Sequence, residues 1–495
     1  MQIKDLIFEN EIEFGKEFLS LCINNIETDP NLIKEGCLFF LINSEDPLKN
    51  EKKLTMLLLK APTAVISDSE DLISRISAPI IKVKCARYAL AYAYFRFYKI
   101  DLSKFKLIGI TGTAGKSTVS TMLKAILEKQ GERVGYLGTG KIMIGDIALS
   151  GKDYSMTTPD PSILYKSLRK MQDEGCRYVI CEVSSHALHF NKLSPLRFSL
   201  SAFTNLSSEH LDIHRDMESY YRTKLKLFEK SEIAIFNLDD KYSKRAYFEV
   251  NTDIKYTVSM NTSADAKAIG YESHGLRGST YFYKEKDFII KVCLPMPADY
   301  NVANSLIAIK AAVALGFKPA VAKEALKAFQ GLEGRYEVIS VSPTVIIDYA
   351  HTPEEMEKFI KSVYSTLISG QTLTVLFGCG GERDKEKRPK MAAIAEKYSS
   401  NVIVTEDNSR GEDTSEIIED ILSGFQKTES RKVITSREAA IKRSILEAKR
   451  DDVILLIGKG HERYSIDASG IRDFDERMIV KAALQERSIS YEDKR

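Results

Sequence analysis

A glycine-rich turn between an apolar run and a helix-like run constrains the fold of this chain more than any other feature. The run Gly-Ile-Thr-Gly-Thr-Ala-Gly-Lys-Ser-Thr occupies residues 109–118, directly after Leu107 and Ile108 and before a helical pattern over 119–128. A strand, a glycine-rich turn and a helix in this order form a cradle for phosphate. Glycines let backbone N–H groups turn towards phosphate oxygens, and the helix N-terminus adds partial positive charge.

Two side chains of this turn indicate a specific chemistry. Lys116 can reach the β and γ phosphates of a nucleotide, and the hydroxyl of Ser117 can hold Mg²⁺. An ordinary turn rich in glycine and threonine is the competing interpretation, but Gly-Lys-Ser stands at the strand–helix junction that a phosphate loop requires. The spacing Gly-x-x-Gly-Lys-Ser is shorter than that of the common Walker A motif, which points away from GTPases and kinases.

Length, charge and cysteine content exclude several classes of protein. The chain has 495 residues, which predicts about three domains. Its net charge of +2 provides no bulk attraction to nucleic acid or to an anionic membrane. No signal peptide is apparent, and no apolar run reaches the ~18 residues of a membrane span. The seven scattered cysteines fit a reducing compartment. We therefore expect a cytoplasmic protein with no nucleic-acid partner and no membrane span.

Apolar runs alternate with runs of helical period over most of the chain. Residues 1–104 show strand signals at 37–42 and 64–66 and a helix at 86–98. Residues 105–335 predict strands at 106–110, 177–183, 200–204 and 232–237, and helices at 119–129, 162–174, 217–230 and 301–315. The pattern restarts over 336–495, with strands at 344–348, 373–377, 401–405 and 453–457 and helices at 353–367, 390–398 and 415–426.

This alternation predicts an α/β protein with mostly parallel sheets covered by helices. We expect three domains. Residues 1–104 would form a small mixed α/β N-terminal domain, residues 105–335 a central P-loop ATPase-like domain with a parallel sheet, and residues 336–495 a C-terminal Rossmann-like domain. Ligands of such sheets bind beyond the carboxyl ends of the strands.

Polar clusters stand at those predicted strand ends. Glu182 ends one apolar strand, and a carboxylate there is costly to bury unless it is paired or bound to metal. His210 belongs to a run of histidines and acids after the next strand, which favours a site over a purely structural cluster. Glu182 and His210 could hold a second Mg²⁺ beside the one at Ser117. Glycine-rich and charged runs also follow three strands of the last domain, at 378–389, 406–413 and 458–463.

Taken together, these motifs resemble those of the Mur ligase family, most closely the MurE type, the UDP-N-acetylmuramoyl-tripeptide synthetases. The similarity extends from about residue 105 to 480. Besides the phosphate loop it rests on 157–159, 182–188, 205–207 with 210–212, 301 with 304, 334–335, 348–353, 378–384, 407–410 and 458–462. The resemblance implies an ATP-dependent amide ligase of peptidoglycan biosynthesis, which adds a diamino acid to a UDP-muramoyl-dipeptide through an acyl phosphate.

The resemblance also implies roles for individual residues. Catalysis would involve Lys116, Glu182, His210 and Lys224, with Ser117, Glu182 and His210 as metal ligands and Lys224 carbamylated. ATP would bind at Gly112, Thr113, Gly115, Lys116, Ser117, Thr118, Asn301, Asn304, Arg335, Asp348 and His351. The UDP substrate would bind at Thr157, Thr158, Ser184 and Lys192. On composition alone, Lys224 would belong to an amphipathic helix whose lysines face solvent.

The predicted C-terminal domain contains the residues that bear on the identity of the amino-acid substrate. Its guanidinium and amide groups offer donors for carboxylates, and Glu462 offers an acceptor for a second ammonium, which fits meso-diaminopimelate. L-Lysine and ornithine stay open as alternatives, because Ser409 stands where the family run Asp-Asn-Pro-Arg has proline. The expected binding residues are Arg383, Asp407, Asn408, Arg410, Gly458 and Glu462.

The chain departs from the family most clearly in its N-terminal domain. The usual Asp-Ser-Arg element is replaced near 29–31, and the usual Asp-Gly element is lost around 43–50. Two other functions compete with the ligase. A folylpolyglutamate-type ligase with another acceptor is disfavoured by the runs at 407–410 and 458–462, and a non-catalytic nucleotide-binding paralogue should have lost residues such as Lys116. We expect a monomer that uses ATP and Mg²⁺.

Overall fold

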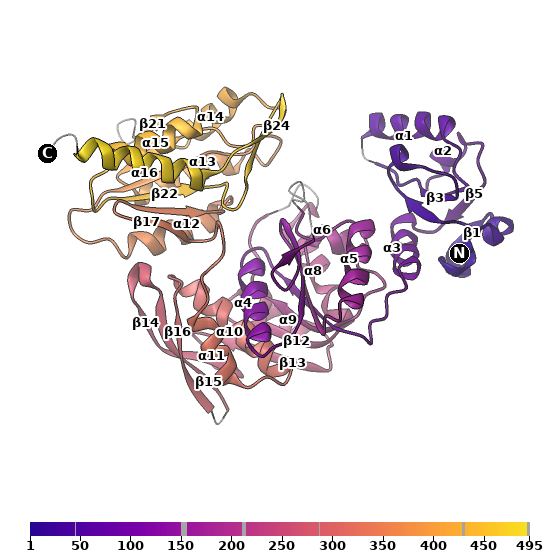
Figure 1. Cartoon of the computed structure of the whole chain (residues 1–495), viewed down its shortest axis with the longest axis horizontal. Coiled ribbons are helices and arrows are strands. Elements are labelled where there is room, and N and C mark those ends of the chain that lie inside the picture. The colour runs from indigo at the N-terminus through magenta and orange to yellow at the C-terminus, as the bar shows by residue number, and fades with distance from the viewer. Residues whose placement is uncertain (45, 150–155, 210–213, 287, 428–430, 493–495) are drawn as a thin grey trace. The chain divides into compact units, whose positions relative to one another are not determined.

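The computed structural model describes residues 1–44, 46–149, 156–209, 214–286, 288–427 and 431–492 (Figure 1). The chain divides into two compact units. Unit 1 comprises Met1–Leu206, His214–Val258 and Ile307–Lys318, and unit 2 comprises Ser207–Ile213, Ser259–Leu306 and Pro319–Arg495. Within the described ranges, no helix combines the length and the apolar character needed to cross a bilayer.

The N-terminal part of unit 1, indigo in Figure 1, contains a sheet of its own. The strand order is β1 (Ile12–Phe14), β5 (Ile80–Val83), β4 (Ala64–Ser67), β3 (Cys37–Phe40) and β2 (Asn25–Glu27), and only β1 pairs antiparallel. Its helices are α1 (Pro47–Leu59), α2 (Glu70–Ile73) and α3 (Ala86–Phe97), with short 3₁₀ turns at η1 (Ile3–Asp5), η2 (Glu9–Glu11), η3 (Lys16–Ser20) and η4 (Pro30–Leu32). Every residue of β3 and β4 is buried, as in a parallel sheet covered on both faces. The strands and the helix predicted here are confirmed.

The larger sheet of unit 1 positions the glycine-rich turn. Its strands run in the order β13 (Ile254–Ser259), β12 (Ser231–Asn237), β11 (Phe198–Phe203), β6 (Lys106–Thr111), β10 (Tyr178–Glu182), β7 (Val134–Gly138), β8 (Lys141–Ile144) and β9 (Ile147–Ala148). The strands from β13 to β7 are parallel, whereas β8 and β9 pair antiparallel. The turn follows β6, which lies between β11 and β10, so residues at the ends of both neighbours surround it.

The helices of unit 1 agree with the predicted pattern except at three places. They are α4 (Lys116–Lys129), α5 (Pro161–Asp173), α6 (Ser185–His189), α8 (Met217–Leu225) and α9 (Lys241–Glu249). The helix predicted over 217–230 is too long, because α8 ends at Leu225 and a separate 3₁₀ turn, η5 (Phe228–Lys230), follows. The short α6 and α9 were not predicted, since neither carries a long enough apolar period. The predicted helix at 301–315 is confirmed as α10 (Asp299–Ala314).

Unit 2 contains an antiparallel meander that the sequence did not reveal. It consists of β14 (Ala266–Ser273), β15 (Ser279–Glu285) and β16 (Phe288–Leu294), with the 3₁₀ turn η6 (Gly275–Arg277) between the first two. Helix α11 (Pro319–Lys327) packs against β16. The strands of the meander alternate buried and exposed residues, so the prediction of mostly parallel, fully buried strands missed them.

The C-terminal part of unit 2 is a second α/β layer structure. Its strand order is β17 (Glu337–Val341), β18 (Thr344–Asp348), β22 (Val453–Ile457), β19 (Leu373–Phe377), β20 (Asn401–Val404) and β21 (Arg431–Val433), and only β17 pairs antiparallel. The helices are α12 (Pro353–Tyr364), α13 (Lys387–Tyr398), α14 (Thr414–Leu422), α15 (Arg437–Glu447) and α16 (Glu476–Glu492). A hairpin of β23 (Tyr464–Asp467) and β24 (Gly470–Asp473) follows β22.

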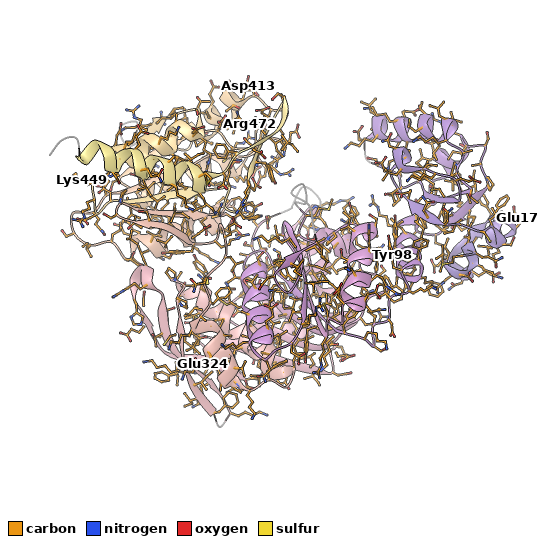
Figure 2. All side chains as sticks on the ribbon, viewed as in Figure 1. Glu17, Tyr98, Glu324, Asp413, Lys449 and Arg472 are labelled. Carbon is orange, nitrogen blue, oxygen red and sulfur yellow. The ribbon has the colours of Figure 1, made fainter. Side chains whose placement is uncertain are left out.

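Both faces of this C-terminal sheet are covered. Alternate residues of β22 belong to different apolar cores, with Leu455 in one and Leu456 in the other. The four strands predicted here are confirmed, while β17, β21 and the hairpin were missed. Figure 2 shows the side chains on the ribbon, with Asp413, Lys449 and Arg472 labelled on this part of the chain.

Candidate active site

The glycine-rich turn lies between β6 and α4, as the sequence predicts. Gly112 has φ +149° and Gly115, the residue before α4, has φ +83°, in the region that favours glycine. A Cβ on Gly112 would overlap the hydroxyl of Thr204, which follows β11. The close approach of Thr204 therefore requires glycine at position 112.

Lys116 crosses this turn from the first residue of α4. Its Nζ donates to the carbonyl oxygens of Gly112 and Thr113 at 2.9 and 2.6 Å. The backbone N–H of Ala114 donates to Asn205 Oδ1 at 3.0 Å, so the segment after β11 holds the turn from its other side. Ser117 and Thr118 continue into the helix. The predicted phosphate-loop residues thus form one local structure.

Glu182 is fully buried at the end of β10 and accepts hydrogen bonds from three hydroxyl groups. Ser117 Oγ donates to Oε2 at 2.9 Å, Thr139 Oγ1 donates to the same oxygen at 3.0 Å, and the hydroxyl of Tyr136 donates to Oε1. Tyr136 lies on β7 and Thr139 directly after it, and neither belongs to a motif, so sequence reasoning missed both. Three hydroxyl donors offset the cost of burying the carboxylate.

The residues at this end of β10 fit Mg²⁺. A serine hydroxyl and a carboxylate 2.9 Å apart are oxygen ligands of the kind that Mg²⁺ prefers. His210, the third predicted ligand, lies outside the described residues. Among the residues that the structure describes, no group of three or more His, Cys, Asp and Glu side chains is placed to hold a metal ion.

Lys224 on α8 is buried, contrary to the expectation from composition alone. It is 1% exposed, and its Nζ donates to the carbonyl oxygen of Gly112 at 3.0 Å and lies 4.7 Å from the ring centre of Tyr220. Its helix neighbour Arg222 and the nearby Lys226 are exposed. The amphipathic pattern of the helix cannot predict the burial of Lys224, because its side chain donates to a backbone carbonyl oxygen outside its own helix. The amine therefore lies at the phosphate loop.

Three of the four predicted UDP-substrate residues lie together beside Glu182. Thr158 Oγ1 donates to the carbonyl oxygen of Glu182 at 2.7 Å and lies 3.2 Å from Ser184 Oγ. Thr157 Oγ1 lies 3.1 Å from Thr139 Oγ1. These hydroxyl groups thus cluster at the carboxyl end of β10.

Lys192 belongs to a different place in unit 1. It forms an ion pair with Asp160 at 2.6 Å and lines an open pocket of about 260 Å³. The pocket also has Arg87, whose guanidinium lies 4.4 Å from the ring centre of Phe190. The remaining lining residues are Thr28, Ile42, Asn43, Ser44, Lys53, Leu90, Tyr94, Pro161 and Ser162. Sequence reasoning missed Lys53 and Arg87, because neither stands in a recognisable motif.

Asp348, Arg335 and His351 lie in unit 2 around the end of β18. The buried carboxylate of Asp348 accepts the backbone N–H groups of Tyr336 and Ala350, each at 2.7 Å. Burial raises the pKa of Asp348 to about 6 despite the opposing charge of Arg335. The guanidinium of Arg335 lies 4.6 Å from the ring centre of Tyr349.

His351 lies between two carboxylates of the same unit. Its Nε2 is 3.0 Å from Glu209 Oε1, and its Nδ1 is 3.3 Å from Glu355 Oε2. Burial alone would lower the pKa of His351, but the charges of Glu355 and Glu209 outweigh it and raise the pKa above its usual value. His351 therefore keeps its proton to a higher pH in the folded protein than a free histidine does.

Asn301 and Asn304 lie on one face of the first turns of α10, and both are buried. Asn301 Nδ2 donates to the carbonyl oxygen of Pro297 at 2.7 Å, and Asn304 Nδ2 lies 3.4 Å from Asn301 Oδ1. The pair is therefore linked side chain to side chain. Their role at a nucleotide stays a prediction.

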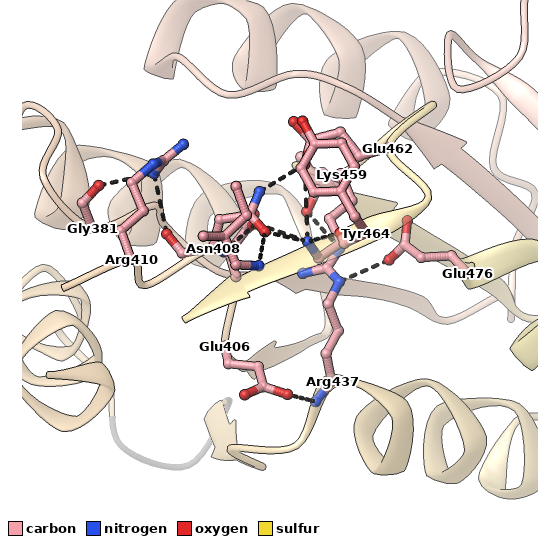
Figure 3. Close-up of polar contacts among 12 residues, drawn as sticks. Gly381, Glu406, Asn408, Arg410, Arg437, Lys459, Glu462, Tyr464 and Glu476 are labelled. Carbon is pink, nitrogen blue, oxygen red and sulfur yellow. Dashed lines mark hydrogen bonds and ion pairs between the residues drawn. The ribbon is translucent and has the colours of Figure 1, made fainter. Parts of the chain in front are cut away.

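The predicted amino-acid residues converge beyond β19, β20 and β22 (Figure 3). Asn408 Nδ2 donates to Glu462 Oε2 at 2.7 Å, and a Cβ on Gly458 would lie 2.8 Å from Asp407 Oδ2. Arg410 Nη1 donates to the carbonyl oxygens of Gly381 and Asn408 at 2.9 and 3.2 Å.

Arg383 completes the predicted set from the loop after β19. Its side chain is exposed, and both its Cγ and Arg410 Nη1 lie within 4 Å of a Cβ built on Gly380. The side chains of Arg383 and Arg410 thus both approach Gly380, and each carries a forked donor for a carboxylate. The loops that carry them are strained, since Glu382 and Arg410 both have φ +54°.

The two acids of this cluster, Asp407 and Glu462, have pKa values that are shifted in opposite directions. Burial favours the neutral acid at Asp407, but Lys459 and Arg437 outweigh it and hold the pKa of Asp407 below its usual value. Burial and the nearby charge of Asp407 raise the pKa of Glu462. A cationic group that bound next to Glu462 would therefore stabilise the negatively charged form of this carboxylate.

Sequence reasoning missed the buried cations that support these loops. Arg388 on α13 is fully buried and binds both carboxylate oxygens of Glu412 at 2.8 Å, while Glu412 accepts the backbone N–H of Glu382 at 3.0 Å. Lys459, inside the run Gly-Lys-Gly-His-Glu, is 1% exposed. An arginine on a helix or a lysine in a loop is ordinarily expected to face solvent, so only tertiary contacts identify Arg388 and Lys459 as buried.

Comparison with known proteins agrees with this geometry. The model of the Mur ligase middle domain matches residues 110–312, and the model of the Mur ligase glutamate ligase domain matches residues 334–460. The chain belongs to the Mur ligase family. It is therefore a ligase, and the family's use of ATP agrees with a phosphate loop at Gly112–Ser117.

Relatives of this Mur ligase are similar along its whole length. A protein of Clostridioides difficile (strain 630) named UDP-N-acetylmuramoyl-L-alanyl-D-glutamate--2,6-diaminopimelate ligase is 37% identical over 495 residues, 98% of this chain and 99% of its own. A protein of the same name from Clostridium tetani (strain Massachusetts / E88) is 35% identical over 494 residues, 98% of this chain and 100% of its own. A solved structure of a ligase of that name has 26% identity and a TM-score of 0.69, covering 99% of both chains. The predicted family, three-domain α/β fold class and ligase activity are confirmed.

Proposed function

We propose that this Mur ligase joins meso-diaminopimelate to UDP-N-acetylmuramoyl-L-alanyl-D-glutamate with consumption of ATP, in peptidoglycan biosynthesis. The observation that supports the choice of amino acid most strongly is the pairing of Asn408 with Glu462 beside Arg410. The two relatives described above are named 2,6-diaminopimelate ligases, and the similarity to them covers 98% of this chain.

The reaction needs an activated acid, because a carboxylate is a poor acylating agent. An oxygen of the glutamate carboxylate attacks the γ-phosphorus of ATP, the bond to the β-phosphate oxygen breaks, and ADP leaves. The product is an acyl phosphate. An amine of diaminopimelate then attacks its carbonyl carbon, phosphate leaves, and the new amide nitrogen loses a proton. Both steps develop negative charge on oxygens, so fixed positive groups lower their barriers.

The phosphate loop supplies such groups. Lys116 now donates to two carbonyl oxygens of its own turn, and on nucleotide binding its ammonium would transfer to the β and γ phosphates. Backbone N–H groups of 112–118 would bind the same phosphates at the N-terminus of α4. Lys224 lies against Gly112 and, as a carbamate, would give this side of the loop an anionic oxygen pair for a cation.

Mg²⁺ fits the oxygens beside this loop. Ser117 would hold one Mg²⁺, and Glu182 with His210 would hold a second beside it. Bound there, the two ions would supply positive charge against the phosphate oxygens. Tyr136 and Thr139 hold the Glu182 carboxylate in place through their hydroxyl groups. Thr157, Thr158 and Ser184 would then orient the acid to be activated, since their hydroxyl groups stand at the same strand end.

The C-terminal cluster would select the incoming amino acid. Diaminopimelate carries an ammonium and a carboxylate at each end, so its far end needs both an acceptor and a forked donor. Glu462 offers the acceptor, and Arg410 and Arg383 offer guanidinium donors. Lysine and ornithine lack the far carboxylate, so they would leave a guanidinium without its partner.

We extend the proposal to organisation and location. Residues 1–104 would bind the UDP end, residues 105–335 ATP, and residues 336–495 the amino acid, with Asn301, Asn304, Arg335, Asp348 and His351 contributing to the nucleotide site. The 260 Å³ pocket at Arg87 and Lys192 would receive the uridine diphosphate, because its three cations, Lys53, Arg87 and Lys192, suit phosphate. A cytoplasmic monomer would carry out the reaction.

Parallel assays test the proposal directly. Purified protein, ATP, Mg²⁺ and the UDP-muramoyl-dipeptide are combined with diaminopimelate, lysine or ornithine, and phosphate release and UDP-tripeptide are both measured. We expect one phosphate for each tripeptide and the highest kcat/KM with diaminopimelate. Equal or better turnover with lysine would overturn the choice of amino acid, and turnover only with a folate acceptor would overturn the muramoyl substrate.

A further inference from the structure

Lys459 lies beneath the proposed amino-acid pocket and is closed off from solvent. Its side chain is 1% exposed, so it has no surface on which a substrate could rest. Its Nζ donates to Asn408 Oδ1 at 2.8 Å and to the carbonyl oxygen of Tyr464 at 3.0 Å. It also lies 3.5 Å from Asp407 Oδ1 and 3.9 Å from Glu462 Oε2 (Figure 3). One ammonium therefore touches three side chains of the pocket.

The contacts of Asn408 fix the orientation of its amide. An ammonium and a backbone N–H are donors only, so the Asn408 atom that Lys459 and Ile466 N share at 2.8 and 3.0 Å must be the oxygen. The amide nitrogen then faces Glu462, whose carboxylate accepts at 2.7 Å. Nδ2 has two N–H groups, and the second has no partner among the described residues. The pocket is thus left with one amide donor in a defined direction.

Lys459 also separates two acids. Asp407 and Glu462 both stand in the buried part of the cluster, where like charges disfavour each other strongly. The ammonium lies within 4 Å of both carboxylates and offsets their repulsion. Without it, Glu462 would be expected to turn away from Asp407 or to take up a proton, and in either case it could no longer accept an ammonium group.

We propose that Lys459 is a positioning residue that holds the Asn408 amide and the Glu462 carboxylate in the orientation that receives the far end of the diamino acid. This inference rests on the proposed function, since it takes this cluster as the amino-acid pocket. Lys459 acts on the affinity for the amino acid through Asn408 and Glu462. We expect it to leave the affinity for ATP unchanged, because the contacts described for Lys459 are to Asn408, Tyr464, Asp407 and Glu462.

The test is the kinetics of Lys459→Met, which replaces the ammonium by an apolar side chain of similar length. We expect the KM for diaminopimelate to rise at least about tenfold, as for loss of a hydrogen bond to a charged group, while the KM for ATP stays unchanged. KM does not depend on the fraction of folded protein, so a partly unfolded preparation still gives the answer. If Lys459→Met is insoluble, Lys459→Gln keeps a donor for Asn408 Oδ1 without the charge and should raise the same KM.

A double variant distinguishes positioning from a general structural role. Because Lys459 acts partly through Asn408, Lys459→Met should raise the KM by a smaller factor in an Asn408→Ala background than in the wild type. Lys442→Met is the matched control, because the side chain of Lys442 on α15 is 41% exposed and pairs only within its own helix with Glu438 among the ion pairs described. Its kinetics should match those of the wild type.

The outcomes separate the inference from the proposed function. If the wild type extends no UDP-muramoyl-dipeptide with any diamino acid, the proposed function fails. If the wild type is active and Lys459→Met leaves the KM for diaminopimelate unchanged, only the inference fails. It also fails if the KM values for ATP and diaminopimelate rise together, or if the effects of Lys459→Met and Asn408→Ala multiply in full.

Discussion

Ser117 Oγ donates to Glu182 Oε2 at 2.9 Å, which joins the start of α4 to the end of β10 across 65 residues of sequence. The contact arises because β6 and β10 are neighbours in the sheet, so a hydroxyl after one strand meets a carboxylate that ends the other. In a Mur ligase these two oxygens stand where the phosphates of ATP and their cation are expected. We propose that the chemistry of the central domain depends on this pair.

Lys116→Ala should abolish turnover. The substitution removes the ammonium at the start of α4 that we expect to bind the phosphates, so kcat should fall at least about 1,000-fold, the upper range for loss of a transition-state donor. Phosphate release in the presence of all substrates measures it. Lys129→Ala, at the exposed end of the same helix, is the control and should leave kcat unchanged. A Lys116→Ala enzyme with normal kcat would remove this residue from the mechanism.

Glu182→Gln should weaken the response to Mg²⁺. Glutamine keeps an oxygen for the hydroxyl of Tyr136 but lacks the negative charge that a divalent cation needs. We expect the Mg²⁺ concentration for half-maximal activity to rise about tenfold or more. A Mg²⁺ titration at saturating ATP measures this. An unchanged midpoint would show that the cation binds elsewhere.

Lys224 should carry carbamate. The amine is buried against Gly112, whereas Lys226 is exposed, so the two lysines provide a matched comparison. Protein equilibrated with ¹³C-bicarbonate should give a carbamate signal in ¹³C NMR that is absent from Lys224→Ala and present in Lys226→Ala. Loss of the signal in both variants, or in neither, contradicts the assignment.

Arg410→Ala should mainly raise the KM for the amino acid. Its guanidinium lies against the carbonyl oxygen of Asn408, and removal of a forked donor for a carboxylate should raise this KM about tenfold or more. Arg472→Ala on the exposed hairpin is the control. If the KM for diaminopimelate stays at its wild-type value in Arg410→Ala, the pocket is wrongly placed.

We predict that His351 contributes to the stability of the fold in a pH-dependent way. Its pKa is raised in the folded state by Glu355 and Glu209, so its ion pairs stabilise the fold below the unfolded value near 6.5 and are lost as pH rises through the folded pKa. The Tm difference between wild type and His351→Gln should be larger at pH 5.5 than at pH 9. A difference that grew with pH would have the wrong sign for a protonated histidine.

The sequence predicted the strands that carry the site better than it predicted the contacts of the site. Buried strands such as β6, β10 and β22 have continuous apolar runs, and their motifs follow directly, so both were recognised. The meander β14–β16 was missed because its strands are half exposed. Lys459 and Arg388 were missed because a lone cation is expected to face solvent until another element brings a carboxylate or an amide oxygen to it.

Transfer of isotopic oxygen tests the central claim most directly. The glutamate carboxylates of the UDP-muramoyl-dipeptide are labelled with ¹⁸O, and the phosphate released during addition of diaminopimelate is analysed by mass spectrometry. If an acyl phosphate forms, each phosphate released should carry one ¹⁸O atom from the carboxylate that becomes the amide. Phosphate without the label, or tripeptide formed while ATP is not consumed, would contradict the account.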